Sequence, residues 1–311
     1  MKPEVVVVRP YMPEIMAELE RDYTLHRLWE AGDRAALLEG ARGAKGLATT
    51  GDAGVDAALI DALPALEIIA CMGVGVDAID LAHARRKGIA VTYTPDVLND
   101  EVANMAIALL LAVTRQICAG DRYVRDGKWL ERPMHLCRTV VGRRCGILGL
   151  GRIGKAIARR AEALGCEIVY HGRHEQPDQS YRYYADLVEM AQASDFVVVI
   201  TPGGEGTRNL VTRAVLDALG PEGVLVNVAR GSVVDEPALV AALQEGRLGA
   251  AGLDVFADEP RVPEALLAMD NVVLQPHQGS ATIETRTAMC NLVVENLRAH
   301  FAGKPLVTPV N

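Results

Sequence analysis

Short apolar runs alternate with mixed polar segments along most of the chain. Four such runs in the first hundred residues have the length of buried strands, and Glu14–Arg21 and Ile79–Lys87 have helical spacing. Strands that alternate with helices predict βαβ units, and nearly continuous apolar strands predict a parallel sheet covered on both faces. The strands expected here are Val5–Val8, Gly46–Thr49, Ile68–Cys71 and Ala90–Thr92.

A long apolar segment follows at Glu101–Ala119, and Asn99 or Asp100 can cap its amino end. A helix that is apolar on nearly all sides is buried on nearly all sides. We therefore expect this helix to lie between domains or in a dimer interface.

A second α/β series begins after this helix, and its six expected strands are enough for a dinucleotide-binding sheet. We expect the last helix, Thr282–Phe301, to return to the first domain. The pattern thus predicts two Rossmann-like, doubly wound parallel-sheet domains with an active-site cleft between them. Residues 1–99 and 282–311 would form a flavodoxin-like substrate-binding domain, and residues 100–281 an inserted dinucleotide-binding domain. The six strands are expected at Cys145–Leu148, Glu167–Tyr170, Phe196–Ile200, Val224–Val228, Gly249–Asp254 and Val272–Gln275.

Composition narrows the functional classes. The 311 residues carry a formal net charge of −8, which disfavours binding to nucleic acid or to anionic membrane surfaces. No apolar run approaches the ~18 residues of a membrane span, and the valine run at Val5–Val8 is too short for a signal peptide. The six cysteines form no C-x-x-C pair. We expect buried free thiols, which fit a reducing compartment, and therefore a cytoplasmic location.

The segment from Gly149 to Gly154 reads G-x-G-x-x-G between an expected strand and an expected helix. In this setting Gly149 permits a tight turn, Gly151 lets the backbone approach a pyrophosphate, and Gly154 allows close packing of helix on strand. The phosphates would meet free amides and the positive end of the helix dipole. The segment therefore predicts a dinucleotide site rather than a purely structural turn.

The end of the next strand bears on the choice of dinucleotide. It reads Tyr170-His171-Gly172-Arg173, with no carboxylate for a ribose 2′-hydroxyl, and Arg173 can bind a 2′-phosphate. We predict that NADP(H) is preferred and NAD(H) possible. The alternative is that Arg173 points into solvent and the site accepts both. His171 and His174 have no third ligand nearby in the sequence, so no metal is expected.

An arginine, a glutamate and a histidine follow three successive expected strands. They are Arg230, Glu259 and His277, and ligands of open α/β sheets lie beyond the carboxyl ends of the strands. Reduction of a keto acid needs a proton donor, which a histidine supplies near neutral pH, and a carboxylate on the other ring nitrogen fixes the tautomer. An arginine can grip the substrate carboxylate and polarise the carbonyl. We assign His277 as acid/base, Glu259 as its partner and Arg230 as substrate clamp.

The order and spacing of these motifs resemble the D-isomer-specific 2-hydroxyacid dehydrogenase family over nearly the full length. The motifs are Gly149–Gly154, Asn227–Gly231, Gly252–Pro260 and Pro276–Ser280. The resemblance implies the three roles given above, a contact of Asp254 with the nicotinamide carboxamide, and binding of the substrate carboxylate by the amides of Val74 and Gly75. The Tyr170–Arg173 segment is similar to that of NADPH-using glyoxylate and hydroxypyruvate reductases. The expected dinucleotide contacts are Gly149, Gly151, Arg152, Ile153, Gly154, His171, Arg173, Thr201, Pro202, Thr207, Val228, Ala229, Asp254, His277 and Gly279.

The expected activity is NADPH-dependent reduction of glyoxylate or hydroxypyruvate to glycolate or D-glycerate, in a homodimer. Two alternatives stay open, a reductase of bulkier keto acids such as 4-hydroxyphenylpyruvate and a non-catalytic, dinucleotide-sensing protein similar to corepressors. Two departures from the family are visible. The stretch Pro133–Cys137 lacks the aromatic side chain that reaches a neighbouring subunit in some relatives, and Thr201–Thr207 is unusually rich in glycine.

Overall fold

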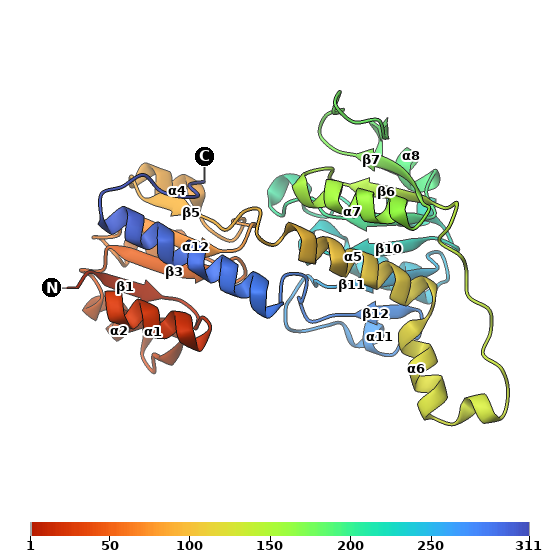
Figure 1. Ribbon diagram of the computed structural model, residues 1–311, viewed down its shortest axis with the longest axis horizontal. Helices are drawn as coiled ribbons and strands as arrows, with labels where there is room; N and C mark the ends of the chain where they lie inside the picture. Colours follow the sequence, from red (N-terminus) through yellow and green to blue (C-terminus); the bar gives the residue numbers. More distant parts are fainter. Residues whose placement is uncertain (1, 311) are drawn as a thin grey trace. The chain divides into compact units, whose positions relative to one another are not determined.

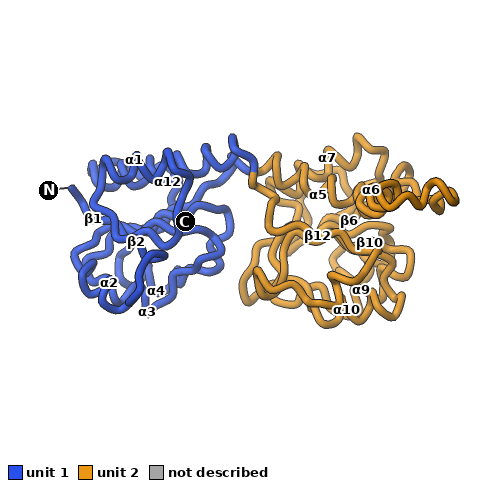
Figure 2. The backbone as a smooth tube through the Cα atoms, turned by 90° about the horizontal axis from the view of Figure 1, so that it is seen from below, with its two compact units in different colours: residues 1–98, 282–311 blue, residues 99–281 orange. Residues whose placement is uncertain are grey.

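The computed structural model describes residues 2–310. The chain divides into two compact units, Met1–Leu98 with Thr282–Asn311 as unit 1 and Asn99–Ala281 as unit 2 (Figures 1 and 2). Each unit contains one sheet whose strands are all parallel, with helices on both faces. The predicted α/β class with two doubly wound parallel sheets is therefore confirmed.

Unit 1 has the strand order β2-β1-β3-β4-β5, which is that of flavodoxin-like sheets. In β1 the fully buried Val6 packs against the core on one face of the sheet, and Val5 and Val7 pack on the other. This burial on both faces explains why the strand reads as a continuous apolar run. The strands are β1 (Glu4–Val7), β2 (Thr24–Arg27), β3 (Gly46–Thr50), β4 (Ile68–Met72) and β5 (Ala90–Thr92).

Helix α12 follows unit 2 in the sequence but packs in unit 1. A Cβ atom at Gly46 of β3 would lie 3.3 Å from the Phe301 ring, so the glycine lets this helix approach the sheet closely. Arg298 of α12 also forms an ion pair with Asp22 at the end of α1. The helices of unit 1 are α1 (Pro13–Asp22), α2 (Arg34–Gly40), α3 (Ala57–Asp61), α4 (Leu81–Arg86) and α12 (Ile283–Phe301), with the 3-10 turn η1 (Leu28–Glu30).

Unit 2 has seven strands in the order β12-β11-β10-β9-β6-β7-β8, one more than predicted. The strand missed is β8, at the edge of the sheet. Chain order reverses between β6 and β9, and this switch point is where such sheets bind ligands. The strands are β6 (Arg144–Leu148), β7 (Glu167–His171), β8 (Arg182–Tyr184), β9 (Phe196–Val199), β10 (Val224–Asn227), β11 (Ala250–Leu253) and β12 (Val272–Leu274).

Helices α5 and α7 lie side by side over one face of this sheet (Figure 1), and α8, α9 and α10 share a core on the other face. The helices are α5 (Asn99–Thr114), α6 (Ile117–Arg125), α7 (Arg152–Ala163), α8 (Leu187–Gln192), α9 (Arg213–Leu219), α10 (Glu236–Gln244) and α11 (Glu264–Leu267). The 3-10 turns are η2 (Lys128–Leu130), η3 (Glu205–Thr207) and η4 (Gly231–Val233).

The prediction of a single helix over Glu101–Ala119 is wrong near its carboxyl end, where α5 stops at Thr114 and α6 begins at Ile117. Gln116 has a positive φ of 51°, which ends α5, and α6 continues at an angle of 56°. In the described part of the chain no single helix has the length and apolar character of a membrane span. Helices α5 and α6 have the length and hydropathy of a membrane span only when the bent pair is counted as one segment. Buried core helices meet the same two criteria.

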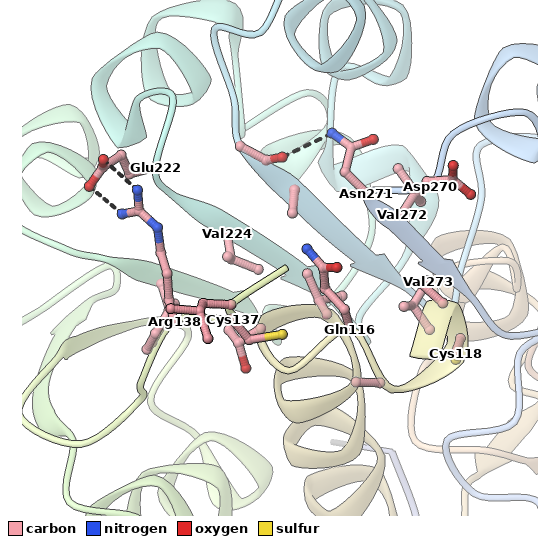
Figure 3. Close-up of a pocket in the computed structure, with 18 of the residues that line it drawn as sticks. Gln116, Cys118, Cys137, Arg138, Glu222, Val224, Asp270, Asn271, Val272 and Val273 are labelled. Carbon is pink, nitrogen blue, oxygen red and sulfur yellow. Dashed lines mark hydrogen bonds and ion pairs between the residues drawn. The ribbon is translucent and has the colours of Figure 1, made fainter. Parts of the chain in front are cut away.

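Helix α6 and the segment up to Arg138, here called the arm, extend away from the sheet of unit 2 (Figure 1). Ion pairs hold its base, Arg122 to Asp270 and Arg138 to Glu222. A cavity of about 220 Å³ lies between this base and the sheet (Figure 3). Its lining residues on the sheet, such as Val224 and Val272, begin β10 and β12, so the cavity lies at the amino-terminal edge of the strands.

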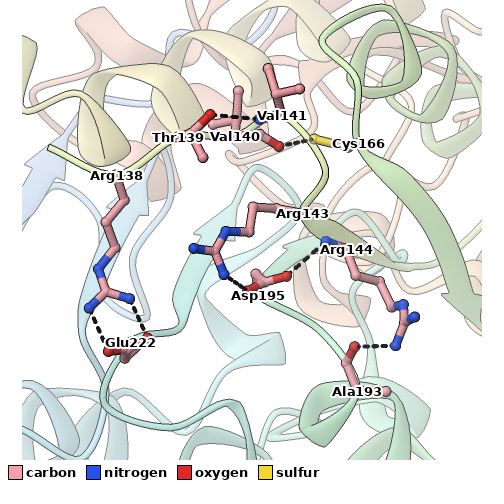
Figure 4. Close-up of polar contacts among 10 residues, drawn as sticks. All are labelled: Arg138, Thr139, Val140, Val141, Arg143, Arg144, Cys166, Ala193, Asp195 and Glu222. Atoms are coloured by element: carbon pink, nitrogen blue, oxygen red, sulfur yellow. Dashed lines mark hydrogen bonds and ion pairs between the residues drawn. The ribbon is translucent and has the colours of Figure 1, made fainter.

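The amino-terminal edge near β6 is held by one carboxylate (Figure 4). Asp195, just before β9, accepts hydrogen bonds from Nη1 of Arg143 at 3.0 Å and from the amide of Arg144 at 2.8 Å. Arg144 also donates to the carbonyl of Ala193 at 3.0 Å. These contacts fix the start of β6 against β9, and thus the strand that leads into the glycine segment.

Candidate functional site

The glycine segment Gly149–Gly154 joins β6 to α7, and two of its glycines are required by space. Gly149 has a φ of 103°, and a Cβ there would lie 3.0 Å from the Ile200 carbonyl oxygen beyond β9. A Cβ at Gly154 would lie only 2.1 Å from the Gly149 carbonyl oxygen. The first turn of the helix therefore rests directly on the loop, as the sequence motif predicts.

Gly151 is different, because it is exposed and a Cβ there would meet no atom within 4 Å. It is the N-cap of the twelve-residue helix α7, and no side chain caps the amides that follow. Free amides at a helix amino terminus, next to open space at a glycine, fit a pyrophosphate. The residues present at this loop therefore suit a dinucleotide.

The loop after β7 lies against the glycine segment. Gln176 donates from Nε2 to the Leu150 carbonyl at 2.8 Å, and its amide donates to the hydroxyl of Tyr170 at 2.7 Å. His171 donates from Nδ1 to the Tyr184 carbonyl at 2.9 Å, which leaves Nε2 for another contact. Arg173 is exposed and pairs with none of residues 2–310.

The loop that contains Thr201, Pro202 and Thr207 follows β9. Thr207 donates its hydroxyl proton to the Pro202 carbonyl at 2.7 Å, which closes the loop on itself. Gly204 has a φ of 118°, so at least one of the glycines in this loop serves a backbone conformation that side chains disfavour. Val228 and Ala229 are buried beyond β10, and the Val228 amide donates to Val199.

Arg230 follows β10 in a turn that Asn227 holds. The buried Asn227 side chain accepts from the Ala229 amide and donates to the Arg230 carbonyl, each at 3.0 Å. Gly231, the next residue, has no room for a side chain, since a Cβ would lie 1.9 Å from the carbonyl carbon of Phe256. The turn that carries Arg230 is therefore packed directly against the loop that carries Glu259.

Glu259 and His277 are brought together by the loops after β11 and β12. Nδ1 of His277 lies 2.7 Å from Oε2 of Glu259, and the other carboxylate oxygen accepts from the Phe256 amide at 3.0 Å. Both side chains are about one-third exposed. The peptide bond from Glu259 to Pro260 is cis.

Charge and burial act in opposite directions on Glu259. Burial raises its pKa, but the hydrogen bond and charge of His277, the Phe256 amide and the charge of Arg230 outweigh it, so the pKa is lowered overall. Glu259 is therefore an ionised acceptor near neutral pH. The Nδ1 atom of His277 then donates, and Nε2 is left for a reacting molecule.

Asp254, at the end of β11, shapes the backbone of His277. Its two carboxylate oxygens accept from the amides of Gln278 at 2.6 Å and Gly279 at 2.8 Å, and its carbonyl accepts from the His277 amide. These bonds hold His277 at a φ of 54°. Burial raises the pKa of Asp254 against the lowering effect of the two amides. This backbone role is additional to the nicotinamide contact that the resemblance implies.

In unit 1, Val74 and Gly75 lie in the loop after β4. Their amides donate to no acceptor among residues 2–310, and both residues are partly exposed. Gly73 before them is held by its amide, which donates to the Thr94 hydroxyl at 2.9 Å. Consecutive free amides in such a turn can bind an anion.

Three residues that support the site were not among those predicted from the sequence as its members. They are Asn227, which pins the turn of Arg230, Gly231, which allows the close contact with Phe256, and Glu236, which accepts from the Ala257 amide at 3.0 Å. For Gly231, its place directly after Arg230 was the feature of the sequence that could have identified it. In the described part of the chain no three His, Cys, Asp or Glu side chains gather in a way that could hold a metal ion.

Comparison with known proteins identifies the family. Residues 107–279, more than half of the chain, match the family described as D-isomer specific 2-hydroxyacid dehydrogenase, NAD binding domain. The chain belongs to the D-isomer specific 2-hydroxyacid dehydrogenases. Within unit 2 these residues form the nicotinamide dinucleotide-binding domain of that family, as the glycine segment predicted.

Similar members of this family cover almost the whole chain. A glyoxylate/hydroxypyruvate reductase of Arabidopsis thaliana is 51% identical over 307 residues, 98% of each chain. A hydroxyphenylpyruvate reductase of Plectranthus scutellarioides is 50% identical over the same length and share of each chain. The solved structure of an NADPH-dependent glyoxylate/hydroxypyruvate reductase of Sinorhizobium meliloti, in complex with NADP and malonate, is 43% identical with a TM-score of 0.92. That comparison covers 100% of this chain and 97% of the other.

Proposed function

We propose that this protein is an NADPH-dependent D-2-hydroxyacid dehydrogenase that reduces glyoxylate or hydroxypyruvate to glycolate or D-glycerate. The observation that carries the proposal is the His277–Glu259 pair beside the turn of Arg230, in the same unit as an open dinucleotide loop. The glyoxylate/hydroxypyruvate reductases that are similar to the chain over nearly its full length support the substrate class.

His277, Glu259 and Arg230 divide the work of the reaction. A dinucleotide, when bound, would supply the hydride that the carbonyl carbon receives. His277 gives a proton from Nε2 to the carbonyl oxygen, so the C=O bond becomes an alcohol and the imidazole becomes neutral. Glu259 holds the ring through Nδ1 and stabilises its charged form before transfer. Arg230 binds the substrate carboxylate and polarises the carbonyl oxygen.

The amides of Val74 and Gly75 in unit 1 are proposed to bind the same substrate carboxylate. Their lack of acceptors within the described chain supports this role, because an unpaired amide gains a hydrogen bond from an anion without losing one. The domain division proposed for the family then follows, with unit 1 as the substrate-binding part and unit 2 as the dinucleotide-binding part.

The dinucleotide is proposed to lie along the carboxyl edge of the unit 2 sheet. Amides of the glycine segment and of Arg152 and Ile153 would hold its pyrophosphate. We infer a preference for NADPH, since Arg173 is exposed without a partner among residues 2–310 and Nε2 of His171, at the end of β7, is uncommitted. NADH is the weaker alternative. The remainder of the dinucleotide would be lined by Thr201, Pro202, Thr207, Val228, Ala229, Asp254, His277 and Gly279.

A second candidate substrate is 4-hydroxyphenylpyruvate, which the similarity to a hydroxyphenylpyruvate reductase favours. It requires the same proton donor and the same clamp, with a larger space beyond the keto group. A dinucleotide-sensing protein without turnover is the remaining alternative, and the His277–Glu259 pair argues against it.

The proposed partners are the small acid substrate and a second copy of the chain, with neither nucleic acid nor membrane. Exposed apolar side chains on the arm, including Trp129 and Leu130, support a homodimer. The formal charge of −8 opposes binding to nucleic acid. Six free cysteines support a reducing compartment such as the cytoplasm.

The deciding experiment is oxidation of NADPH by the purified protein with glyoxylate, hydroxypyruvate, pyruvate and 4-hydroxyphenylpyruvate in parallel, repeated with NADH. We expect the fastest turnover with NADPH and the two small acids. His277→Ala and Arg230→Ala should each lose most of this turnover, while Glu264→Ala, an exposed change in the first turn of α11, should retain it. Turnover of 4-hydroxyphenylpyruvate alone would establish the second candidate, and no turnover with any pair would refute both.

A further inference from the structure

Glu236, the first residue of α10, reaches the loop that carries Glu259. Its Oε2 accepts a hydrogen bond from the Ala257 amide at 3.0 Å. The amide just before it, that of Phe256, donates to Oε1 of Glu259, also at 3.0 Å. Two consecutive amides of one turn are thus held by two carboxylates, one of which is the partner of His277.

The other polar support of this turn comes from within the same loop. The Asp258 carboxylate accepts two hydrogen bonds from the exposed Arg261 at 2.7 Å each, which ties the turn to no other element. Ala257, Asp258 and Pro260 are exposed and the Glu259 side chain is about one-third exposed, so packing alone does not fix their positions. The backbone contact at Gly231 supports the turn from one side, where a Cβ would lie 2.3 Å from the Ala257 nitrogen. The Glu236 carboxylate holds the same nitrogen through its proton.

Glu236 itself stands on a well-fixed element. Asp235 caps α10 by accepting from the Ala238 amide at 3.1 Å, and its own amide donates to the Val211 carbonyl at 3.0 Å. The buried Leu239 and Leu243 anchor the helix in the core. The first turn of α10 can therefore act as a rigid support for the exposed loop beside it.

We propose that Glu236 is a positioning residue, which fixes the Ala257 amide and thereby keeps Glu259 directed at Nδ1 of His277. The inference rests on the proposed function, because it concerns the same acid–base pair. The charged groups around the imidazole are Glu259 and Asp254, and Arg230 acts on Glu259. When the turn loosens, Glu259 leaves the ring for part of the time, and the protonated imidazole loses its main stabilising charge.

The variants separate this role from a purely structural one. Glu236→Gln keeps an acceptor oxygen and loses the charge, and Glu236→Ala loses both. A glutamate in the first turn also stabilises its helix through the dipole, and Glu264 is a matched control for that effect. It occupies the first turn of α11, is exposed, and makes no contact with the Ala257 amide.

The test is the pH profile of kcat for reduction of hydroxypyruvate with NADPH, using the full-length protein. We expect Glu236→Ala to lower kcat about tenfold, below the usual ~10²–10⁴-fold contribution of general acid–base catalysis, because the pair is loosened but not removed. KM should change little, and the alkaline limb of kcat should move to lower pH. Glu236→Gln should keep the native kcat and the native position of the alkaline limb of the pH profile. Glu264→Ala should alter neither. If Glu236→Ala does not fold, Glu236→Asp, which is too short to reach the amide, takes its place.

A second readout does not depend on turnover. The Nδ1 proton of His277, followed by NMR, should exchange with solvent faster in Glu236→Ala than in the native protein, because the Glu259 carboxylate holds it for less of the time. An active native enzyme whose alanine variant keeps both the alkaline limb of kcat and the native exchange rate would overturn the positioning role alone. An inactive native protein would overturn the proposed function, and the exchange rate would still decide whether Glu236 acts on His277.

Discussion

Nδ1 of His277 lies 2.7 Å from Oε2 of Glu259, while Oε1 of the same carboxylate accepts a hydrogen bond from the Phe256 amide. The carboxylate is anchored to the backbone by one oxygen and orients the imidazole with the other. Only Nε2 of the ring is then left to meet a substrate. This relationship fixes which nitrogen can transfer a proton, and so makes the acid–base assignment testable by changing the carboxylate alone.

Glu259→Gln should lower kcat for keto-acid reduction about a hundredfold, within the ~10²–10⁴-fold range of general acid–base catalysis. The amide no longer stabilises the protonated imidazole, so the alkaline limb of kcat should also move to lower pH. The measurement is kcat against pH with NADPH and hydroxypyruvate. An unchanged limb would show that Glu259 does not act through His277.

The same pair gives a stability signature with a definite sign. The pKa of Glu259 is lowered on folding, so its stabilising contribution is present above the unfolded pKa and is lost as pH falls through the folded pKa. The native protein should therefore lose more stability on acidification than Glu259→Gln. Thermal unfolding of both proteins across the acid range checks this expectation, and parallel curves would contradict it.

Changing two glycines of the dinucleotide loop to alanine should have different effects, a loss of stability at one position and weaker NADPH binding at the other. Gly154→Ala places a Cβ 2.1 Å from the Gly149 carbonyl oxygen, and such overpacking costs about 1–3 kcal/mol of stability. Gly151→Ala has room, so its effect on stability should stay below about 1 kcal/mol. The added methyl group would nevertheless occupy the approach of the pyrophosphate.

Thermal unfolding and NADPH titration together check this pair. We expect Gly151→Ala to keep its Tm and bind NADPH at least tenfold more weakly, a loss of about 1.4 kcal/mol. Gly154→Ala should have a lower Tm than the native protein. Normal NADPH binding by a folded Gly151→Ala protein would mean that the phosphates do not approach at this glycine.

Most strands found from the sequence are short, nearly continuous apolar runs. The edge strands β5 and β12 were found because they keep such runs, whereas the edge strands β2 and β8 were missed because Thr24–Arg27 and Arg182–Tyr184 mix polar with apolar residues. The break after α5 was missed too. Gln116 adopts a left-handed conformation without a glycine or proline to announce it, so the apolar pattern runs through the bend.

The candidate site divides in the same way. Arg230, Glu259 and His277 stand directly after parallel strands, where topology alone gathers side chains at one edge. Glu236 acts through tertiary packing, since it meets the Ala257 amide only because α10 lies beside the loop after β11. In the sequence it is indistinguishable from any glutamate in the first turn of a helix.

Arg173→Ala should weaken the binding of NADPH much more than the binding of NADH. The exposed guanidinium has no partner in the described chain, so its loss removes a charge-assisted contact with the 2′-phosphate without breaking an internal bond. We expect a rise of about tenfold or more in the KM for NADPH, equivalent to ~1.4 kcal/mol. Arg213→Ala, an exposed arginine of the same unit paired with Asp217, is the control. Equal effects on the two dinucleotides would show that Arg173 does not read the phosphate.

The arm should carry the contact between two copies of the chain. Leu130 and Leu136 are 93% and 96% exposed, which is costly for large apolar side chains on one extended segment. Leu130→Asp should shift the native mass toward that of a monomer, as measured by light scattering over a range of concentrations. Val307→Asp, at an exposed apolar position of unit 1, should leave the mass unchanged. A native protein that is already monomeric would refute the proposed homodimer.

Asp254→Asn tests how the backbone of His277 is held. An asparagine offers one acceptor oxygen where the structure needs two, so its amide group would face the N–H of Gln278 or Gly279. A buried donor left without a partner costs about 1–3 kcal/mol, and kcat should fall together with Tm as His277 leaves its left-handed conformation.

Burial raises the pKa of Asp254, so the stability that this group contributes is full below its unfolded pKa and falls as pH rises through its folded pKa, a slope that asparagine removes. Asp33→Asn, an exposed change in unit 1 that still offers an oxygen to cap α2, should leave Tm, kcat and that slope as they are. An Asp254→Asn protein with native Tm and kcat would show that the two amides do not hold the loop.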